Sequence, residues 1–212
     1  MPTTLWSVRT GRDRLESQTR AALIAAAKVT FSQLGYARTT VADITERADV
    51  SRATFYVYFA SKDEVFRVLT EQLRDAFLAA QEAYGADQHD PVAVVAASVT
   101  GFVTVYAANL AFITVLEHQA LTDEQVRALW QGIRERLLQR MTRFVRQLAR
   151  DGVAHPLAPP DLVATAASGM AIRFAPLIAA SPADRTRIMG HLVRLYLQTL
   201  GIQPGQSAKE PS

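Results

Sequence analysis

The tightest constraint on the fold is a series of helix start signals close together in the first third of the chain. Thr40, Ser51 and Ser61 are residue types that cap helices, because their side-chain oxygen accepts a backbone N–H from the first turn. Asp43 and Glu64 stand three positions after the first and third of them, and an acid at that position can bond back to the cap. Two short helices are therefore predicted between two longer ones.

The rest of the chain also has helical patterns. In residues 17–34, Leu23, Ile24, Ala27 and Phe31 recur at spacings of three and four, which places them on one buried stripe. No segment alternates apolar and polar residues as a half-buried strand does. Longer helices are predicted over 62–84, 91–107, 110–119, 122–150, 160–179 and 182–200. The predicted fold class is all-α, with an N-terminal three-helix domain and a C-terminal helical bundle.

Composition limits the chemistry that the chain can perform. The chain of 212 residues has no cysteine, which excludes a disulfide scaffold, a thiol nucleophile and cysteine metal ligands. No metal site is expected from its four histidines. There is no nucleophile elbow, phosphate loop or paired catalytic carboxylate, so neither an enzyme nor a cofactor is expected. The net charge of +3 permits nucleic-acid binding without requiring it.

An uncharged stretch between Asp90 and Glu117 is long enough to cross a bilayer. It contains several polar residues, among them Ser98 and Asn109, and no cluster of lysine and arginine flanks it. A buried pair of core helices accommodates these polar groups better than lipid does. No apolar targeting segment follows the polar N-terminal residues, so a cytoplasmic protein without a membrane partner is expected.

Residues 39–62 have the pattern of a helix-turn-helix, in which two short helices cross at a tight turn. The residues that would meet at the crossing are small or apolar, namely Val41, Ile44, Ala48, Val50, Phe55 and Phe59. The opposite face of the second helix carries Arg52, Ala53, Thr54, Tyr56, Val57 and Tyr58. Guanidinium, hydroxyl and small apolar groups of this kind contact phosphates and base edges in the major groove. The segment is therefore predicted to bind DNA.

This segment resembles the DNA-binding domain of the TetR family of bacterial one-component regulators. The resemblance covers residues 17 to about 70 and rests on many positions at fixed offsets, namely Gly35-Tyr36, Thr39-Thr40, Ile44, Ala48, Val50-Ser51, Thr54-Phe55-Tyr56, Tyr58-Phe59, Ser61-Lys62 and Val65. Asp49 departs from the family pattern, because glycine is common at that point of the turn. A positive φ is expected at Asp49, since aspartate tolerates it better than most residues do.

The resemblance implies roles for individual residues. The side chains that would contact phosphates or sugars are those of Thr40, Thr54, Tyr56, Tyr58 and Lys62, and those nearest to base edges would be Arg52 and Ala53. Arg9, Arg12 and Arg14 of the N-terminal arm could add contacts to the backbone or the minor groove. A structural alternative stays open for single residues: Tyr56 and Tyr58 could be packed aromatics, and Thr40 and Ser61 are caps in either case.

The resemblance also implies a domain order. A flexible basic arm is expected over 1–16, the helix-turn-helix domain over 17–62, a connecting helix over 63–84, a ligand-binding and dimerisation domain over 91–200, and a disordered tail over 201–212. In this family the last two helices form the homodimer interface as a four-helix bundle between subunits. The residues suited to that interface are Leu162, Ala166, Gly169, Met170, Leu177, Leu192, Leu195 and Tyr196.

A ligand cavity is expected among the apolar helices of the second domain. Its predicted lining is Phe102, Tyr106, Asn109, Phe112, Leu116, Trp130, Arg173 and Phe174. This mostly apolar and aromatic lining predicts a small hydrophobic or aromatic effector. The polar members could instead be capped or paired residues at helix ends. The many arginines of the helix over 122–150 are interpreted as a solvated face.

Together these features predict a homodimeric, ligand-responsive repressor of transcription. It would bind a palindromic operator in double-stranded DNA and leave it when the small-molecule effector binds. The competing hypothesis is a helical ligand-binding or membrane-associated interaction protein without a DNA target.

Overall fold

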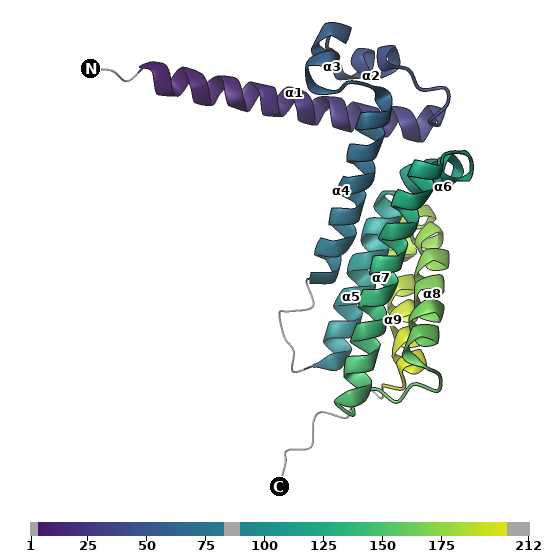
Figure 1. Ribbon diagram of the computed structural model, residues 1–212. Helices are drawn as coiled ribbons and strands as arrows, with labels where there is room; N and C mark the ends of the chain where they lie inside the picture. Colours follow the sequence, from purple (N-terminus) through teal and green to yellow (C-terminus); the bar gives the residue numbers. More distant parts are fainter. Residues whose placement is uncertain (1–3, 83–89, 203–212) are drawn as a thin grey trace.

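The computed structural model describes residues 4–82 and 90–202, and the side chains of 16–80 and 90–202. The described residues form helices and no strand, as predicted (Figure 1). The helices are α1 (Thr4–Leu34), α2 (Val41–Ala48), α3 (Arg52–Tyr58), α4 (Lys62–Glu82), α5 (Pro91–Ala108), α6 (Leu110–Thr122), α7 (Glu124–Arg150), α8 (Pro160–Ala180) and α9 (Arg185–Leu200), with a short 3-10 helix at Pro182–Asp184 before α9.

Helix α4 joins the two halves of the molecule. In Figure 1, α1 lies across one end with α2 and α3 beside it, and α4 runs from there along the bundle of α5 to α9. Helix α4 packs against α1 in the N-terminal half and against α5 and α7 in the bundle. Within the bundle, α8 packs against α5, α7 and α9. The architecture is therefore a three-helix N-terminal domain and a helical C-terminal domain that share α4.

The first helix starts earlier than the sequence pattern indicated. It begins at Thr4 and not at Ser17, so the segment expected to be a flexible basic arm, 1–16, has a helical backbone from Thr4 onward. Between Thr4 and Ser17 the sequence has no proline and one glycine, Gly11, so no strong helix breaker interrupts it. Three predictions fall outside the described residues. They concern the side chains of Arg9, Arg12 and Arg14, the domain boundary as far as residue 89, and the tail beyond residue 202.

The long uncharged stretch is divided between two helices. Asn109 ends α5 and precedes α6, with φ −116° and ψ 8°, so the chain does not continue as one span. By length and composition alone, α5 and α8 could each cross a membrane. In the structure, however, α5 packs against α4, α8 and α9, and α8 is packed on three neighbours as well. This arrangement agrees with the predicted pair of core helices.

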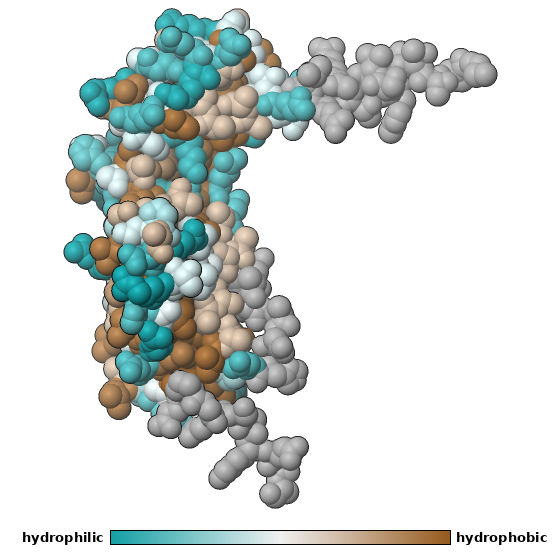
Figure 2. Space-filling model, turned by 180° about the vertical axis from the view of Figure 1, so that it is seen from behind, coloured by the Kyte–Doolittle hydropathy of each residue, from teal (hydrophilic) through white to brown (hydrophobic). Residues whose placement is uncertain are grey.

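One buried cluster runs through both halves. Its largest fully buried side chains include Phe31, Phe55 and Phe59 in the N-terminal domain and Phe112 and Leu192 in the bundle. Burial of this kind stabilises a fold by about 25 cal/mol for each Å² of apolar surface removed from water. Seen from behind, the end that holds α2 and α3 is mostly hydrophilic, and the surface over the bundle has both hydrophilic and hydrophobic patches (Figure 2).

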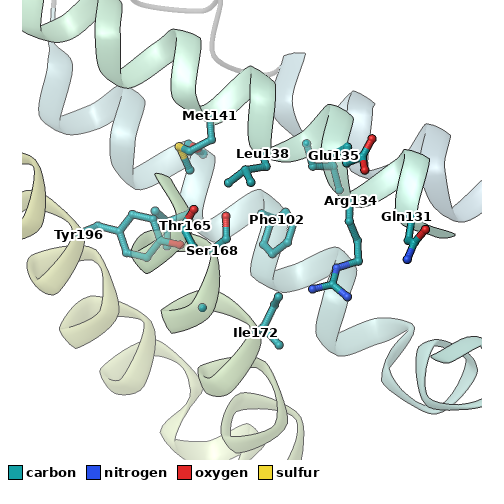
Figure 3. Close-up of a pocket in the computed structure, with 14 residues that line it drawn as sticks. Phe102, Gln131, Arg134, Glu135, Leu138, Met141, Thr165, Ser168, Ile172 and Tyr196 are labelled. Atoms are coloured by element: carbon teal, nitrogen blue, oxygen red, sulfur yellow. The ribbon is translucent and has the colours of Figure 1, made fainter. Parts of the chain in front are cut away.

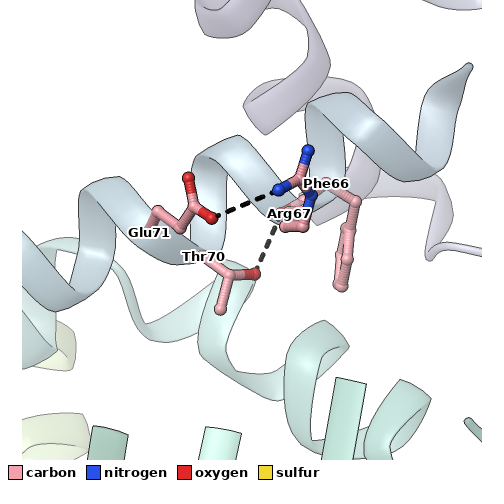
Figure 4. A network of polar contacts seen from close by, with 4 residues as sticks. All are labelled: Phe66, Arg67, Thr70 and Glu71. Carbon is pink, nitrogen blue, oxygen red and sulfur yellow. Dashed lines mark hydrogen bonds and ion pairs between the residues drawn. The ribbon is translucent and has the colours of Figure 1, made fainter. Parts of the chain in front are cut away.

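The buried hydroxyl group of α4, that of Thr70, forms a hydrogen bond within the helix. Thr70 is fully buried, and its hydroxyl donates a hydrogen bond of 2.9 Å to the carbonyl oxygen of Phe66, one turn earlier (Figure 4). On the exposed side of the helix, the Arg67 guanidinium lies 3.6 Å from the Glu71 carboxylate. An exposed pair of this kind adds little stability. The continuity of α4 therefore rests on its backbone and its packing.

The turn between α2 and α3 has the predicted left-handed residue. Asp49 has φ 53° and ψ 48°. The N–H of Asp49 donates to the carbonyl oxygen of Glu46 at 3.2 Å, and that of Val50 to the carbonyl oxygen of Thr45 at 3.1 Å. The second bond spans five residues, as in a Schellman motif, and satisfies a carbonyl at the end of α2. The position is one that glycine fills more easily.

Substitution at Asp49 tests this turn. Asp49→Gly should raise the free energy of unfolding by about 0.5 kcal/mol, because relief of the left-handed strain is partly offset by the greater freedom of glycine in the unfolded chain. Asp49→Val should lower it by about 1 kcal/mol or more, since a β-branched residue resists positive φ. Urea denaturation at one fixed protein concentration measures both, with Asp49→Asn as a near-neutral control. A valine variant as stable as the wild type would contradict the turn geometry.

Candidate DNA interface and effector cavity

The short helices α2 and α3 are held by the predicted caps. The Asp43 N–H donates to the Thr40 hydroxyl oxygen at 3.2 Å, and the Thr40 N–H donates to the Asp43 carboxylate at 2.8 Å, which completes a capping box. The Thr54 N–H donates to the Ser51 hydroxyl oxygen at 3.0 Å. Ser61 accepts the N–H of the residue three positions later at 3.3 Å. These bonds satisfy backbone donors that helices of this length otherwise leave to water.

The inward face of the motif is closed by apolar packing. Ile44 and Phe55 are fully buried and Phe59 nearly so. The rings of Phe55 and Phe59 lie 5.7 Å apart, and the Arg20 guanidinium of α1 lies 5.3 Å from the centre of the Phe59 ring. Because α3 is fixed from its inner side in this way, its opposite face is presented in one orientation.

The outward face of α3 is open to solvent. Arg52 and Ala53 are exposed, and 58% of Tyr56 and 76% of Val57 are accessible. The other two predicted contact residues of α3, Thr54 and Tyr58, are half-buried. The face therefore offers one guanidinium, hydroxyl groups and an apolar side chain on a rigid helix. Such a set can hydrogen-bond phosphates and base edges and can meet a thymine methyl group.

Lys62 has a structural role that the sequence pattern did not reveal. Its ammonium donates to the carbonyl oxygens of Tyr36 at 3.0 Å and Thr39 at 2.9 Å, and lies 4.6 Å from the centre of the Tyr36 ring. The Tyr36 hydroxyl donates to Asp63, and burial, followed by this bond, raises the pKa of Tyr36 above its ordinary value of 10.0. A lysine has three N–H donors, so one remains for a phosphate.

An aromatic cluster joins this domain to the bundle. The Phe66 ring of α4 lies 5.1 Å from Phe31, 4.8 Å from Tyr36 and 5.3 Å from Phe112 of α6. Near it, the Lys28 ammonium of α1 donates to the Asn109 side-chain oxygen at 2.6 Å. We call these residues the junction. The junction fixes the N-terminal domain against the start of α6.

A cavity of about 600 Å³ lies among α5, α7, α8 and α9 (Figure 3). Its lining residues are Ser98, Val99, Phe102, Gln131, Arg134, Glu135, Leu137, Leu138, Met141, Thr165, Ser168, Gly169, Ile172 and Tyr196. Its volume is within the range of small-molecule sites, and its lining combines apolar side chains with polar and charged ones. The cavity can therefore hold a small organic molecule.

Comparison with known proteins agrees with this geometry. The family model described as "Bacterial regulatory proteins, tetR family" matches residues 23–69, which contain the caps, α2, α3 and the start of α4. The regulator TtgR of Pseudomonas putida is 39% identical over 83 residues, which are 38% of this chain and 40% of TtgR. RutR of Escherichia coli is 36% identical over 76 residues, 36% of each chain. Residues 23–69 thus form a DNA-binding domain of the tetR family, and the match spans about 40% of the length of the curated relatives.

Solved structures extend the likeness of this chain to the whole fold. A bacterial regulatory protein of the tetR family from Rhodococcus RHA1 superposes with a TM-score of 0.72 at 24% identity, over 88% of this chain and 98% of that one. A TetR-like transcriptional regulator from Rhodococcus sp. RHA1 gives 0.70 at 21% identity, over 86% and 95%. At these identities the likeness concerns the fold, including the helical C-terminal domain.

Of the eight predicted ligand residues, only Phe102 lines the cavity. Asn109 and Phe112 belong to the junction instead. The remaining predicted residues are placed as follows: Tyr106, Leu116 and Trp130 are buried in the core, Phe174 is half-buried, and Arg173 is exposed on α8. Helical periodicity separates buried from exposed faces, but it does not show which buried face borders a gap. Seven of the eight predicted residues therefore lie outside this cavity, and their role in ligand binding stays a prediction.

Arg134 is exposed on α7, as expected of a solvated face, but the sequence pattern did not indicate that it also borders a cavity. It lines the cavity, and Figure 3 shows its guanidinium extending from α7 toward Phe102 and Ile172. Its charge acts on Tyr106, whose pKa is raised to about 12 by burial and by Glu117, with Arg134 opposing the rise. No group of three metal-ligating side chains occurs within the ranges that the structure describes.

The capping box predicts a pH dependence. Hydrogen bonds from the Thr40 hydroxyl and N–H hold the pKa of Asp43 below its ordinary value of 3.8. The box therefore contributes stability at pH values above 3.8, and this contribution is lost as the pH falls through the lowered pKa of Asp43. In Thr40→Val the hydroxyl is absent and the N–H remains, so the pKa should rise toward 3.8. Carboxyl NMR titration measures it.

Ser51→Ala is the matched control for that titration, because it removes the cap of α3 and leaves the box intact. It should not change the pKa of Asp43. Each variant should lower the free energy of unfolding by about 1 kcal/mol through its lost cap. An Asp43 pKa that is the same with and without the Thr40 hydroxyl would refute the assigned cause.

Proposed function

We propose that this chain is a DNA-binding transcriptional repressor that a small hydrophobic or aromatic effector releases from a palindromic operator. The observation that carries the proposal is the exposed face of α3, held rigidly by caps and apolar packing within the segment that the family model matches. A helix whose inner face is packed and whose outer face carries polar side chains can enter a major groove without changing its conformation.

Individual residues take different roles in this proposal. Arg52 and Ala53, at the start of α3, meet base edges. The hydroxyls and the ammonium that contact phosphates or sugars are those of Thr40, Thr54, Tyr56, Tyr58 and Lys62. Lys62 does so with its one remaining donor, at the first turn of α4, where free backbone N–H groups favour an anion. Specificity then rests on Arg52 and its neighbours, and affinity on the phosphate contacts.

A homodimer through α8 and α9 would place two such faces on one operator. Five of the exposed residues of α8 form a stripe at spacings of three and four, namely Leu162, Ala166, Gly169, Arg173 and Leu177. Alanine and glycine in its centre permit close approach of a second helix. Leu192 and Tyr196, which the sequence pattern also suggested for the interface, are buried within their own subunit. Leu195 is exposed on α9 and can extend the stripe.

Helix α4 can transmit effector binding to the DNA-binding domain. Phe102 lines the cavity and its ring stacks on Phe77 of α4 at 5.0 Å. A Cβ on Gly101 would lie 3.0 Å from the carbonyl oxygen of Ala80, so α4 and α5 approach closely at this point. A molecule that displaces Phe102 must therefore move α4, and the other end of α4 belongs to the junction. The spacing of the two α3 helices in the dimer would change as a result.

Gel-shift titrations test the DNA contacts on a duplex selected from a random library. Arg52→Ala should cost about 1–3 kcal/mol for the selected duplex and less for unrelated DNA, because it removes a base contact. Tyr56→Phe and Lys62→Ala should weaken binding to all sequences, and Lys62→Ala should reduce the salt slope by about one. Binding unchanged in all three variants would sink the proposal and favour a helical ligand-binding protein without a DNA target.

Arg136→Ala is the matched control for these titrations, because Arg136 is an exposed arginine of α7, outside the N-terminal domain. It removes the same charge as Arg52→Ala and should leave DNA affinity unchanged. Thermal unfolding of each variant separates lost contacts from lost folding, which matters for Lys62 because it also bonds two backbone carbonyls.

The dimer is tested by placing a charge in the stripe. Leu177→Glu should convert the dimer to monomer at micromolar concentration, because the proposed interface would bury an unpaired carboxylate. Analytical ultracentrifugation measures the mass. Leu157→Glu is the control, since Leu157 is exposed in the connection between α7 and α8 and lies outside the stripe. A dimer that survives Leu177→Glu and also Ala166→Glu would place the interface elsewhere.

A further inference from the structure

The cavity has one positive charge beside an apolar wall. Arg134 is the one arginine or lysine among its lining residues. Glu135 also borders the cavity, but in Figure 3 its carboxylate lies on the other side of the α7 ribbon from the Arg134 guanidinium. No carboxylate of the described residues forms an ion pair with Arg134. The guanidinium can therefore accept an anionic partner from outside the chain.

The remaining wall favours an apolar molecule with few polar groups. Its apolar members come from three helices and are Val99, Phe102, Leu137, Leu138, Met141 and Ile172. The hydroxyls of Thr165 and Tyr196 already donate to the carbonyl oxygens of Asp161 and Ala167. Ser168 also lines the cavity, and no hydrogen bond of its hydroxyl to a described residue is found. The polar groups left for a ligand are thus the Arg134 guanidinium, which alone carries a positive charge, the Ser168 hydroxyl and the Gln131 amide.

We propose that the effector is a monocarboxylate with an apolar body, bound with its carboxylate on Arg134 and its body against Phe102, Leu138 and Ile172. This inference rests on the proposed function and names the chemical class of its effector. A guanidinium matches a carboxylate with two parallel hydrogen bonds, which strengthen as water leaves. Arg134 is exposed at the edge of the cavity, so a neutral molecule of the same shape would leave the guanidinium in water and gain no such pair.

The single positive charge of the lining matches a ligand with one negative charge. Arg134 is the one cationic lining residue, so a second anionic group would find no cation there. The anchored end also lies close to the route toward α4, because Arg134 extends toward Phe102, which stacks on Phe77. A carboxylate held there positions the apolar body against the ring that connects the cavity to the DNA-binding domain.

Isothermal titration calorimetry tests whether the effector is a monocarboxylate. The three probes have the same chain length and differ in their head group: decanoate, decan-1-ol and decylamine. Decanoate should bind the wild-type protein about 10- to 100-fold more tightly than decan-1-ol, as expected of a charge-assisted pair, and decylamine should bind most weakly. Arg134→Gln should remove the preference for decanoate and leave decan-1-ol binding unchanged. Arg134→Lys should keep part of the preference, because the charge remains without the bidentate geometry.

Arg136→Gln is the matched control, since Arg136 is exposed on the same helix and does not line the cavity. The Arg136→Gln protein should prefer decanoate over decan-1-ol to the same degree as the wild type. Equal binding of decanoate and decan-1-ol, or an equal loss of both in Arg134→Gln, would overturn the proposal, and so would the absence of binding by all three probes. Gel shifts of the same samples without a probe separate this failure from failure of the proposed function, because operator binding does not require the effector.

Discussion

The packing of Phe66 is the contact on which the rest of the structure depends. This ring of α4 touches Phe31 and Tyr36 in the N-terminal domain and Phe112 in the bundle, all within 5.3 Å between ring centres. Aromatic contacts of this geometry add to the burial of large apolar surfaces. Because one residue serves both halves, the direction of α3 is set relative to the bundle, and a shift of α4 cannot leave the DNA-binding face in place.

The same helix reaches the cavity at its other end. Phe77 stacks on Phe102, and Phe102 is part of the cavity wall. Between these two aromatic contacts, α4 is a regular helix whose buried Thr70 is satisfied within the helix itself. A rigid element held at both ends by side-chain packing can have two discrete positions. The structure therefore offers a physical route from an effector in the cavity to the spacing of two recognition helices.

Local rules predicted most of the fold and the motif. The caps at Thr40 and Ser51 and the left-handed Asp49 depend on neighbours only a few residues away, and all three were predicted correctly. The start of α1 at Thr4 was missed, because no residue before Ser17 marks a helix end. The cavity lining was mostly missed for a different reason. Helical periodicity separates buried from exposed faces, and only the three-dimensional packing shows that Asn109 and Phe112 belong to the junction and that Arg134 borders the cavity.

If a dimer of this chain binds DNA through two α3 helices in successive major grooves, it should protect guanine N7 atoms of a selected duplex from methylation. The account predicts two protected clusters related by two-fold symmetry, with centres about 10–10.5 base pairs apart or a multiple of that distance. Arg52→Ala should remove protection within both clusters. Binding without major-groove protection, or a single protected cluster for the dimer, would contradict the account.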